Sequence, residues 1–362
     1  MIQYDDFMRA LAERKKIVYK YLYREEFSSR FHPQHIRDAI YAYMDNGGKS
    51  LRPAALMFAC GAVGGDERKA VPAAAAIEIF HTWTLVHDDI IDRDSKRRGG
   101  PTVHEAFRQR AIREFGYSEE DAAHYGLSIA ILAGDMQQGW AVSILTKLAE
   151  QEGIDPRIPL YLIKDAEMRV LSLLIDGEMR DVQFSKTNIH DVSEEDVLDM
   201  LSKKTGVLYE FAGKAGAMIG LNTPDPDHPL AAAVSAFAAD CGAAFQLQDD
   251  ILGVVGDEEA LGKPVGSDIR EGKRTTIALQ AYRNGNREQR ELLMSVLGNP
   301  NADAKQLKKA AELMRELGGI DYTANLAKRH IERALGRLEA LPPSEYRDLL
   351  HFWADYMIQR TF

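Results

Sequence analysis

The chain has 362 residues, of which 45% are hydrophobic and 28% are charged, and its formal net charge is −10 at pH 7. These values are typical of a soluble globular protein with one large domain or two ordinary ones, and they exclude a disordered chain. The acidic balance argues against a nucleic-acid partner, because proteins that bind phosphate backbones usually have a basic surplus or stripe.

Cysteine content and hydropathy bear on the compartment. Cys60 and Cys241 are the only cysteines and lie far apart in apolar surroundings, so we expect no disulfide framework or zinc cluster, and we predict a cytoplasmic protein. Residues 1–16 lack the apolar core of a signal peptide. The longest apolar run, residues 230–239, is about half of the ~20 residues that a membrane span needs, so no transmembrane segment is expected.

Helical periodicity extends through almost the whole chain. Apolar residues between 36 and 44 follow the spacing i, i+4, i+7 and i+8, and the Asn-Gly-Gly at 46–48 predicts the end of this helix. The same period occurs in residues 307–317 and 320–338, whereas no run of alternating β-branched residues is bounded by turns. We therefore predict an all-α protein, a single large helical bundle with a central cavity that spans residues 1–362 as one domain.

A glycine-rich turn at residues 47–53 reads GGKSLRP. It places Lys49 and Arg52 three residues apart at the start of a helix, where backbone N–H groups and the helix dipole favour an anion. The turn is not a P-loop, because the first glycine and the preceding strand of that motif are missing. Taken alone, such a basic turn is more often only solvated.

The first acidic cluster, HDDIIDRD at residues 87–94, follows an apolar run. Asp88 and Asp92 are four residues apart and project from one face of a helix, with Asp89 beside them. Like charges at this spacing repel, so the arrangement suits a hard cation such as Mg²⁺, which binds carboxylates and phosphate oxygens. The alternative is an acidic, solvated helix end.

Two arginines and a charged stretch follow this cluster. Arg97 and Arg98 begin an RRGG turn, and their guanidinium groups suit phosphate oxygens, although a solvated basic turn is again the alternative. Residues 105–125 are charged and contain Ser-Glu-Glu-Asp at 118–121, which resembles the start of a helix. We interpret this stretch as a solvated elaboration of the bundle.

The second acidic cluster, FQLQDDILG at residues 245–253, ends the apolar run 230–245. Asp249 and Asp250 therefore repeat the setting of the first cluster. Two acidic pairs at the ends of core helices suggest facing walls of one cavity with metal ions between them. Together with the basic turns, the two acidic pairs suggest a site that binds a diphosphate group while an apolar tail of the same ligand enters the core.

These residues resemble the motifs of the trans-isoprenyl diphosphate synthase family, in particular archaeal-type short-chain geranylgeranyl and farnesyl diphosphate synthases. The matches occur in chain order and span most of the sequence. They are the GGKxxRP element, the first aspartate-rich motif with its basic tail, Lys204-Thr205, Phe245-Gln246 with Asp249 and Asp250, and the tail formed by Lys263, Pro264, Asp268 and Lys273.

The resemblance implies roles for individual residues. It implies that three Mg²⁺ ions are held by Asp88, Asp92 and Asp249, supported by Asp89, Asp250 and Asp181. Isopentenyl diphosphate would be bound by Lys49, Arg52, His81 and Arg98, and the allylic diphosphate by Arg97, Lys204 and Lys263. Oxygen dipoles at Lys204, Thr205 and Gln246 would stabilise the allylic cation. His81 lies about 20° from Asp88 around a helix axis, which agrees with a place near the site.

The implied reaction is ionisation of an allylic diphosphate (dimethylallyl, geranyl or farnesyl), attack by the isopentenyl double bond and loss of a proton. The family resemblance also implies a homodimer. Two departures from the family pattern occur in this chain. Gly253 stands where the third aspartate of the second motif is usual, with Asp257 one turn later, and Glu178 stands where glutamine is usual.

Product length depends, in this family, on bulky side chains four, five or eight residues before the first aspartate. These positions are Thr84, Trp83 and Phe80. An aromatic residue five before and a small one four before resemble archaeal geranylgeranyl synthases, so we expect geranylgeranyl diphosphate as the main product. Farnesyl or longer polyprenyl diphosphates are the alternatives, and helix geometry alone would not select Trp83, which lies about 140° from Asp88.

Two other classes of protein share some of these features. A class I terpene cyclase is also an all-α protein with an aspartate-rich motif, but it does not need a second diphosphate site, so Lys49, Arg52 and His81 argue against it. A non-catalytic regulatory subunit should have lost metal ligands, yet Asp88, Asp92 and Asp249 are all present.

Overall fold

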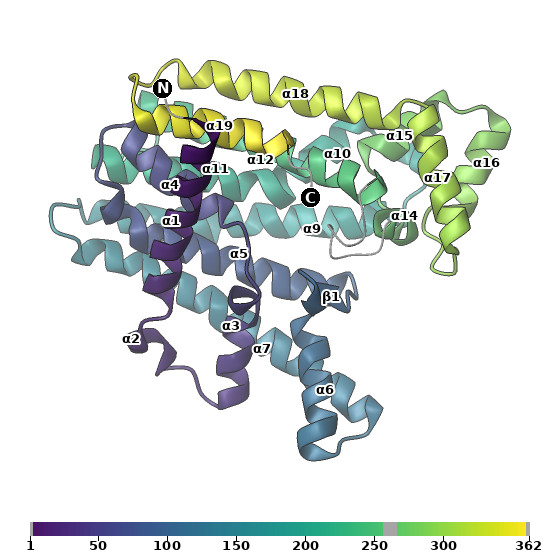
Figure 1. Ribbon diagram of the computed structural model, residues 1–362, viewed down its shortest axis with the longest axis horizontal. Helices are drawn as coiled ribbons and strands as arrows, with labels where there is room; N and C mark the ends of the chain where they lie inside the picture. The colour runs from purple at the N-terminus through teal and green to yellow at the C-terminus, as the bar shows by residue number, and fades with distance from the viewer. Residues whose placement is uncertain (1–2, 256–265, 360–362) are drawn as a thin grey trace. The chain divides into compact units, whose positions relative to one another are not determined.

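The structure is a computed structural model, in which residues 3–255 and 266–359 are described (Figure 1). The described residues are helical almost throughout, with one two-stranded sheet, which confirms the predicted all-α class. The chain divides into two compact units. Unit 1 comprises residues 1–163, 214–228 and 344–346, and unit 2 comprises the remainder. That the whole chain is one domain with a central cavity stays a prediction.

Unit 1 contains the N-terminal helices and the small sheet. Its elements are α1 (Tyr4–Leu22), α2 (Glu25–Ser28), α3 (Gln34–Asp45), α4 (Leu51–Ala62), η1 (Glu67–Ala70), α5 (Val71–Ile91), β1 (Lys96–Arg97), β2 (Gly100–Pro101), α6 (Val103–Phe115), α7 (Glu119–Thr146), η2 (Lys147–Glu150) and α8 (Arg157–Lys164). α11 (Val207–Leu221) has residues in both units.

The core of unit 1 is built on α5, which packs against α4 and α7. All residues of α4 are buried, as are the alanines of the first turns of α5, so these helices approach closely. At Gly126 of α7, an added Cβ would lie 2.1 Å from the backbone oxygen of His104, which shows how tightly α6 packs on α7.

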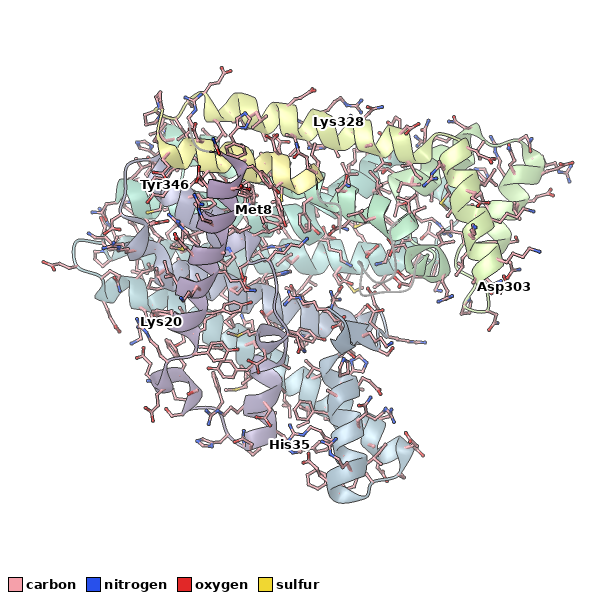
Figure 2. All side chains as sticks on the ribbon, in the orientation of Figure 1. Met8, Lys20, His35, Asp303, Lys328 and Tyr346 are labelled. Atoms are coloured by element: carbon pink, nitrogen blue, oxygen red, sulfur yellow. The ribbon has the colours of Figure 1, made fainter. Side chains whose placement is uncertain are left out.

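The 105–125 stretch forms most of α6, the turn after it and the start of α7, which pair as a helical hairpin (Figure 1). Its charged faces are exposed, but Phe107 and Ala111 form a buried stripe, so it is less solvated than the sequence suggested. Ser118 caps α7 as predicted by accepting from the Asp121 backbone N–H. His35 on α3, labelled in Figure 2, is hydrogen-bonded through Nδ1 to the hydroxyl of Tyr125 in this hairpin, with 2.8 Å between the two atoms.

Unit 2 contains most of the C-terminal half. Its elements are η3 (Asp165–Val170), α9 (Leu171–Phe184), η4 (Ile189–Asp191), α10 (Glu194–Leu201), η5 (Ser202–Gly206), α12 (Pro229–Val255), α14 (Ser267–Glu271), α15 (Thr276–Asn284), α16 (Arg287–Val296), α17 (Ala304–Glu316), α18 (Gly319–Leu338) and nearly all of α19 (Glu345–Gln359).

α12 is the central helix of unit 2 and lies along α18 (Figure 1). By length and composition α12 could cross a membrane, but half of its apolar window is buried, which is also the property of a core helix. η3 and η5 are π-helical turns, a form that is rare and often found at functional sites. η5 contains Lys204 and Thr205, so this turn belongs to the candidate site.

Candidate functional site

The first acidic cluster lies at the C-terminal end of α5. The helix ends at Ile91, and Asp92 is its C-cap. The backbone N–H of Asp92 donates to the backbone carbonyl oxygen of Asp88 at 2.8 Å. Asp88 and Asp92 are half-buried and share one helix face, as the sequence predicted. Asp89 points elsewhere and is fully buried.

Asp89 is held by two neighbouring side chains. Arg97 donates from Nε to Asp89 Oδ1 at 2.7 Å, and the Tyr43 hydroxyl donates to Oδ2. Burial raises the pKa of Asp89, and the hydrogen bond from Arg97 opposes this shift. Burial also disfavours the charge on Arg97, but Asp89 and Asp88 outweigh it and raise the pKa of the guanidinium. Asp89 therefore anchors Arg97, one of the predicted diphosphate ligands.

The β1–β2 hairpin presents the two arginines. Arg98 and Gly99 form its turn, and both have positive φ, 53° and 77°, as a two-residue type I′ hairpin requires. Arg98 Nη1 donates to the Tyr43 carbonyl oxygen at 2.9 Å and also to that of Gly47. A Cβ at Gly48 would lie 2.7 Å from Arg98 Nη1, so the glycine-rich turn leaves room for this side chain.

A cluster of positive charge surrounds His81 on α5. Burial lowers the pKa of His81 well below its ordinary value of 6.5, and the positive charges of Arg52, Arg98 and Arg97 lower it further. The imidazole is therefore neutral at pH 7. The structure thus brings together four of the predicted diphosphate ligands within unit 1, whereas Lys49 lies exposed on the preceding turn. Such a concentration of cations suits an anion.

Glu78, one helical level before His81, balances part of this charge. It is 5% exposed and accepts hydrogen bonds from Ser50 Oγ at 2.8 Å and from the Tyr19 hydroxyl at 3.1 Å. Burial lowers the pKa of the Arg98 guanidinium. Among the effects that oppose this shift, the negative charge of Glu78 is the largest. Glu78 therefore links the glycine-rich turn to Arg98.

The second acidic cluster lies on α12 in unit 2. Asp249 is half-buried and Asp250 is 4% exposed, one and a half turns before the described end of the helix. Asp250 Oδ1 accepts from Gln246 Nε2 at 3.1 Å, whereas Oδ2 is buried with no hydrogen-bond partner among the described residues. Burial and then the charge of Asp268 raise the pKa of Asp250.

The carboxylate of Asp268 on α14 lies next to Gly253, in the space that the side chain of the family's usual third aspartate would enter. A Cβ built on Gly253 would be 2.5 Å from Asp268 Oδ2. The carboxylate of Asp268 thus approaches the backbone of α12 through space that only glycine leaves open. Asp257 and Lys263, both named from the sequence, lie outside the described residues.

Lys204 and Thr205 project from the π-helical turn η5. Lys204 Nζ lies 2.6 Å from Asp181 Oδ2 and 2.9 Å from Glu178 Oε2. Glu178, the glutamate that departs from the family pattern, is therefore an ion-pair partner of Lys204. Thr205 Oγ1 donates to Gln246 Oε1 at 2.8 Å, which brings two residues predicted to stabilise the cation into contact. A Cβ at Gly177 would lie 2.4 Å from the Lys204 backbone nitrogen.

The predicted chain-length residues lie on α5. Phe80 is 5% exposed, and its ring meets that of Trp83 edge to face with 5.1 Å between centroids. Trp83 is half-buried, and Thr84 donates from its hydroxyl to the His81 carbonyl oxygen at 2.8 Å. Because threonine is small, Thr84 adds little bulk at the position that follows Trp83 in the chain.

Comparison with known proteins decides the family. The model of the polyprenyl synthetase family matches residues 33–314. The chain belongs to this family. It is 35% identical to a geranylgeranyl diphosphate synthase of Sulfolobus acidocaldarius over 328 residues, which are 89% of this chain and 90% of the relative. The predicted resemblance and the predicted trans-prenyltransferase activity are thereby confirmed.

Solved structures agree with this assignment. The geranylgeranyl pyrophosphate synthetase of Pyrococcus horikoshii Ot3 has a TM-score of 0.82 and 33% identity, covering 99% of both chains. The geranylgeranyl pyrophosphate synthase of Corynebacterium glutamicum, solved with isoprenyl diphosphate and magnesium, has a TM-score of 0.84 and 27% identity, covering 99% of this chain and all of that one.

Two residues near the motifs were missed in the sequence, and one contact of a third was not foreseen. Tyr43 fits the apolar face of its helix, so no signal distinguished it. Glu78 could have been found, since it is the only acidic residue in the apolar run 71–86. Asp268 was recognised in its motif, but only the structure links it to Gly253.

Proposed function

We propose that the protein condenses isopentenyl diphosphate with allylic diphosphates and that its main product is geranylgeranyl diphosphate. The observation that carries this proposal is the positive cluster formed by Arg52, Arg97 and Arg98 around a neutral His81. His81 lies on α5, the helix whose C-terminal end contains Asp88 and Asp92. Carboxylates for metal and cations for a second diphosphate favour a condensation over a terpene cyclase, which has one diphosphate substrate.

Mg²⁺ fits the donor atoms of both acidic clusters, because carboxylate oxygens are its usual protein ligands. The buried Oδ2 of Asp250, which has no hydrogen-bond partner within residues 3–255 and 266–359, also suits a cation or its bound water. Asp88, Asp92 and Asp249 would hold the metal, with three ions in our proposal, and Asp89, Asp250 and Asp181 would support them. When bound, Mg²⁺ neutralises the charge that develops on the leaving diphosphate.

The side chains of the protein orient the substrates. Arg97, Lys204 and Lys263 bind the allylic diphosphate, while Lys49, Arg52, His81 and Arg98 bind isopentenyl diphosphate. The allylic C–O bond breaks and its electron pair leaves with the diphosphate. The isopentenyl double bond then forms the new C–C bond, and a proton passes to the diphosphate as the product double bond forms. Oxygens of Lys204, Thr205 and Gln246 stabilise the positive charge on carbon.

Chain length is set by Trp83 in this proposal, with Phe80 behind it and the small Thr84 beside it. The edge-to-face contact between the two aromatic rings supports this role, because it forms a continuous bulky surface on α5. The names of the archaeal relatives support a twenty-carbon product. Farnesyl diphosphate is the next candidate, since tryptophan is larger than the usual phenylalanine or tyrosine.

A cytoplasmic homodimer is the state that we propose. Apolar residues on α7 are exposed, among them Ile131 at 42% and Leu132 at 51%, and an exposed apolar surface of this kind favours a second copy as partner. Cys60 and Cys241 are free and buried, which agrees with a reducing compartment. Light scattering of the purified protein tests the dimer by its mass.

Incubation with isopentenyl diphosphate, Mg²⁺ and, separately, dimethylallyl, geranyl and farnesyl diphosphate tests the proposed reaction. The products are dephosphorylated and sized by chromatography. We expect a twenty-carbon alcohol, which should disappear in Asp88→Ala. Cyclic hydrocarbon formed without isopentenyl diphosphate would instead indicate a cyclase, and no turnover with any primer would favour a regulatory subunit.

A further inference from the structure

Trp83 and His87 form a hydrogen-bonded pair on α5. They are four residues apart, so their side chains lie on the same helix face. The Trp83 indole donates from Nε1 to His87 Nδ1 at 3.2 Å, and the two rings meet edge to face with 5.8 Å between centroids. Tryptophan nitrogen can only donate, so His87 Nδ1 is the acceptor and carries no proton.

The other nitrogen of His87 reaches the neighbouring helix. With Nδ1 as acceptor, the neutral imidazole has its proton on Nε2, which lies 3.3 Å from the backbone oxygen of Ile131 on α7 and donates to it. A Cβ at Gly134 would lie 2.1 Å from the same nitrogen. The backbone of α7 therefore contacts the imidazole directly and fixes its position.

The indole of Trp83 is thereby held from two sides. Phe80 packs against it by ring contact alone, which restricts its position without a directional bond. His87 supplies the directional bond and connects the indole to the backbone of α7. Without that acceptor, the indole loses the only hydrogen bond that the described residues give it, and its two side-chain torsions become freer to change.

We propose that His87 is a positioning residue for product length, which holds the Trp83 indole in the orientation that stops the growing chain. The inference rests on the proposed function, because it requires Trp83 to be the chain-length residue. It assigns His87 no contact with substrate or metal. Chain length then depends on a pair of residues and on the glycine that admits the imidazole, beyond the size of one side chain.

Variants at both ends of the hydrogen bond test this inference. His87→Leu keeps similar bulk but removes the acceptor, whereas His87→Asn retains an oxygen acceptor near the position of Nδ1. Trp83→Phe removes the donor, and Trp140→Phe is the matched control, because the buried Trp140 Nε1 has no hydrogen-bond partner among the described residues. The readout is the ratio of longer products to the twenty-carbon product within one reaction, which does not depend on total activity.

We expect His87→Leu to raise this ratio by about two- to tenfold, the range that one neutral hydrogen bond supplies. His87→Asn and Trp140→Phe should keep the wild-type ratio. In a Trp83→Phe background, His87→Leu should cause no further change, since the donor is already absent. A circular dichroism melt of each variant confirms that it is folded. If His87→Leu does not fold, Trp83→Phe tests the hydrogen bond in its place.

The outcomes separate the inference from the proposed function. If Trp83→Ala lengthens the products but His87→Leu leaves the ratio unchanged, the positioning role is wrong and the chain-length assignment stands. An additive effect of His87→Leu in the Trp83→Phe background would likewise contradict it. If Trp83→Ala leaves the products unchanged, both the chain-length assignment and the role of His87 are wrong. Absence of condensation by the wild type would overturn the proposed function itself.

Discussion

Glu78 is a buried acid in an apolar stretch of α5, and its contacts explain why it is tolerated there. Ser50 and Tyr19 donate hydrogen bonds to it, and its negative charge opposes the decrease that burial causes in the pKa of Arg98. A buried carboxylate without such partners would be strongly destabilising. Glu78 thus connects the glycine-rich turn and Arg98, two parts of the proposed isopentenyl diphosphate site.

Glu78→Gln should weaken isopentenyl diphosphate binding. The amide keeps an oxygen acceptor for Ser50 but removes the charge that favours the Arg98 guanidinium, so we expect the KM for isopentenyl diphosphate to rise about three- to tenfold, within the energy of a charged hydrogen bond. The KM for farnesyl diphosphate should stay unchanged. Glu67→Gln, which alters a similar half-buried ion pair with Arg14 at 2.7 Å, is the control. Equal increases in both KM values would contradict this role.

At the residue scale, the sequence was most informative where charge interrupts an apolar pattern. Asp88, Asp92, Asp249 and Asp250 were visible for that reason, because an acid at the end of a core helix needs an explanation. Tyr43 was not visible, since a tyrosine on the apolar face of a helix is ordinary. The contact of Asp89 with Tyr43 and Arg97 joins residues far apart in the chain, which periodicity cannot predict.

At the scale of elements, the helices were predictable and the irregular turns were not. α3 ends two residues before Gly47, and α17 and α18 end within one residue of the periodic segments 307–317 and 320–338. Of the β1–β2 hairpin the sequence predicted only the RRGG turn, and the π-helical turn η5 was not predicted, because it depends on tertiary contacts such as the approach of Lys204 to Gly177. Both of these irregular elements contain proposed ligands.

Restoring the family's third aspartate in α12 should impair the enzyme. In Gly253→Asp, the new Cβ would lie 2.5 Å from Asp268 Oδ2, displace that carboxylate and add negative charge near Asp250, whose pKa is already raised by burial and by Asp268. We expect activity at fixed Mg²⁺ to fall about ten- to a hundredfold, as for loss of a residue that orients metal ligands.

The matched control for this change is Gly139→Ala on α7, where a Cβ meets nothing within 4 Å. This substitution should leave activity unchanged and raise the free energy of unfolding by about 1 kcal/mol, the usual difference between glycine and alanine in a helix. Steady-state assays over a range of Mg²⁺ concentrations and thermal melts measure both effects. Wild-type or higher activity of Gly253→Asp would show that Asp268 does not replace the missing aspartate.

At the scale of the whole molecule, the proposed ligands are divided between the two units. Unit 1 contains Asp88 and Asp92 with the positive cluster around His81, and unit 2 contains Asp249, Asp250 and Lys204. Family membership was predictable because these motifs occur in a fixed order along the chain. The central claim is that both acidic clusters serve one Mg²⁺-dependent condensation.

The most direct test is the rate of product formation from farnesyl diphosphate and labelled isopentenyl diphosphate, measured for the wild type, Asp88→Asn, Asp249→Asn and the double variant. Each substitution removes a charge while keeping the size of the side chain. We expect each single variant to lose at least about a hundredfold in kcat, and the double variant to lose little more, because groups that act as a unit are not additive. Removal of Mg²⁺ with EDTA should abolish wild-type turnover. Activity of either single variant within a few-fold of wild type, or turnover in EDTA, would contradict the account.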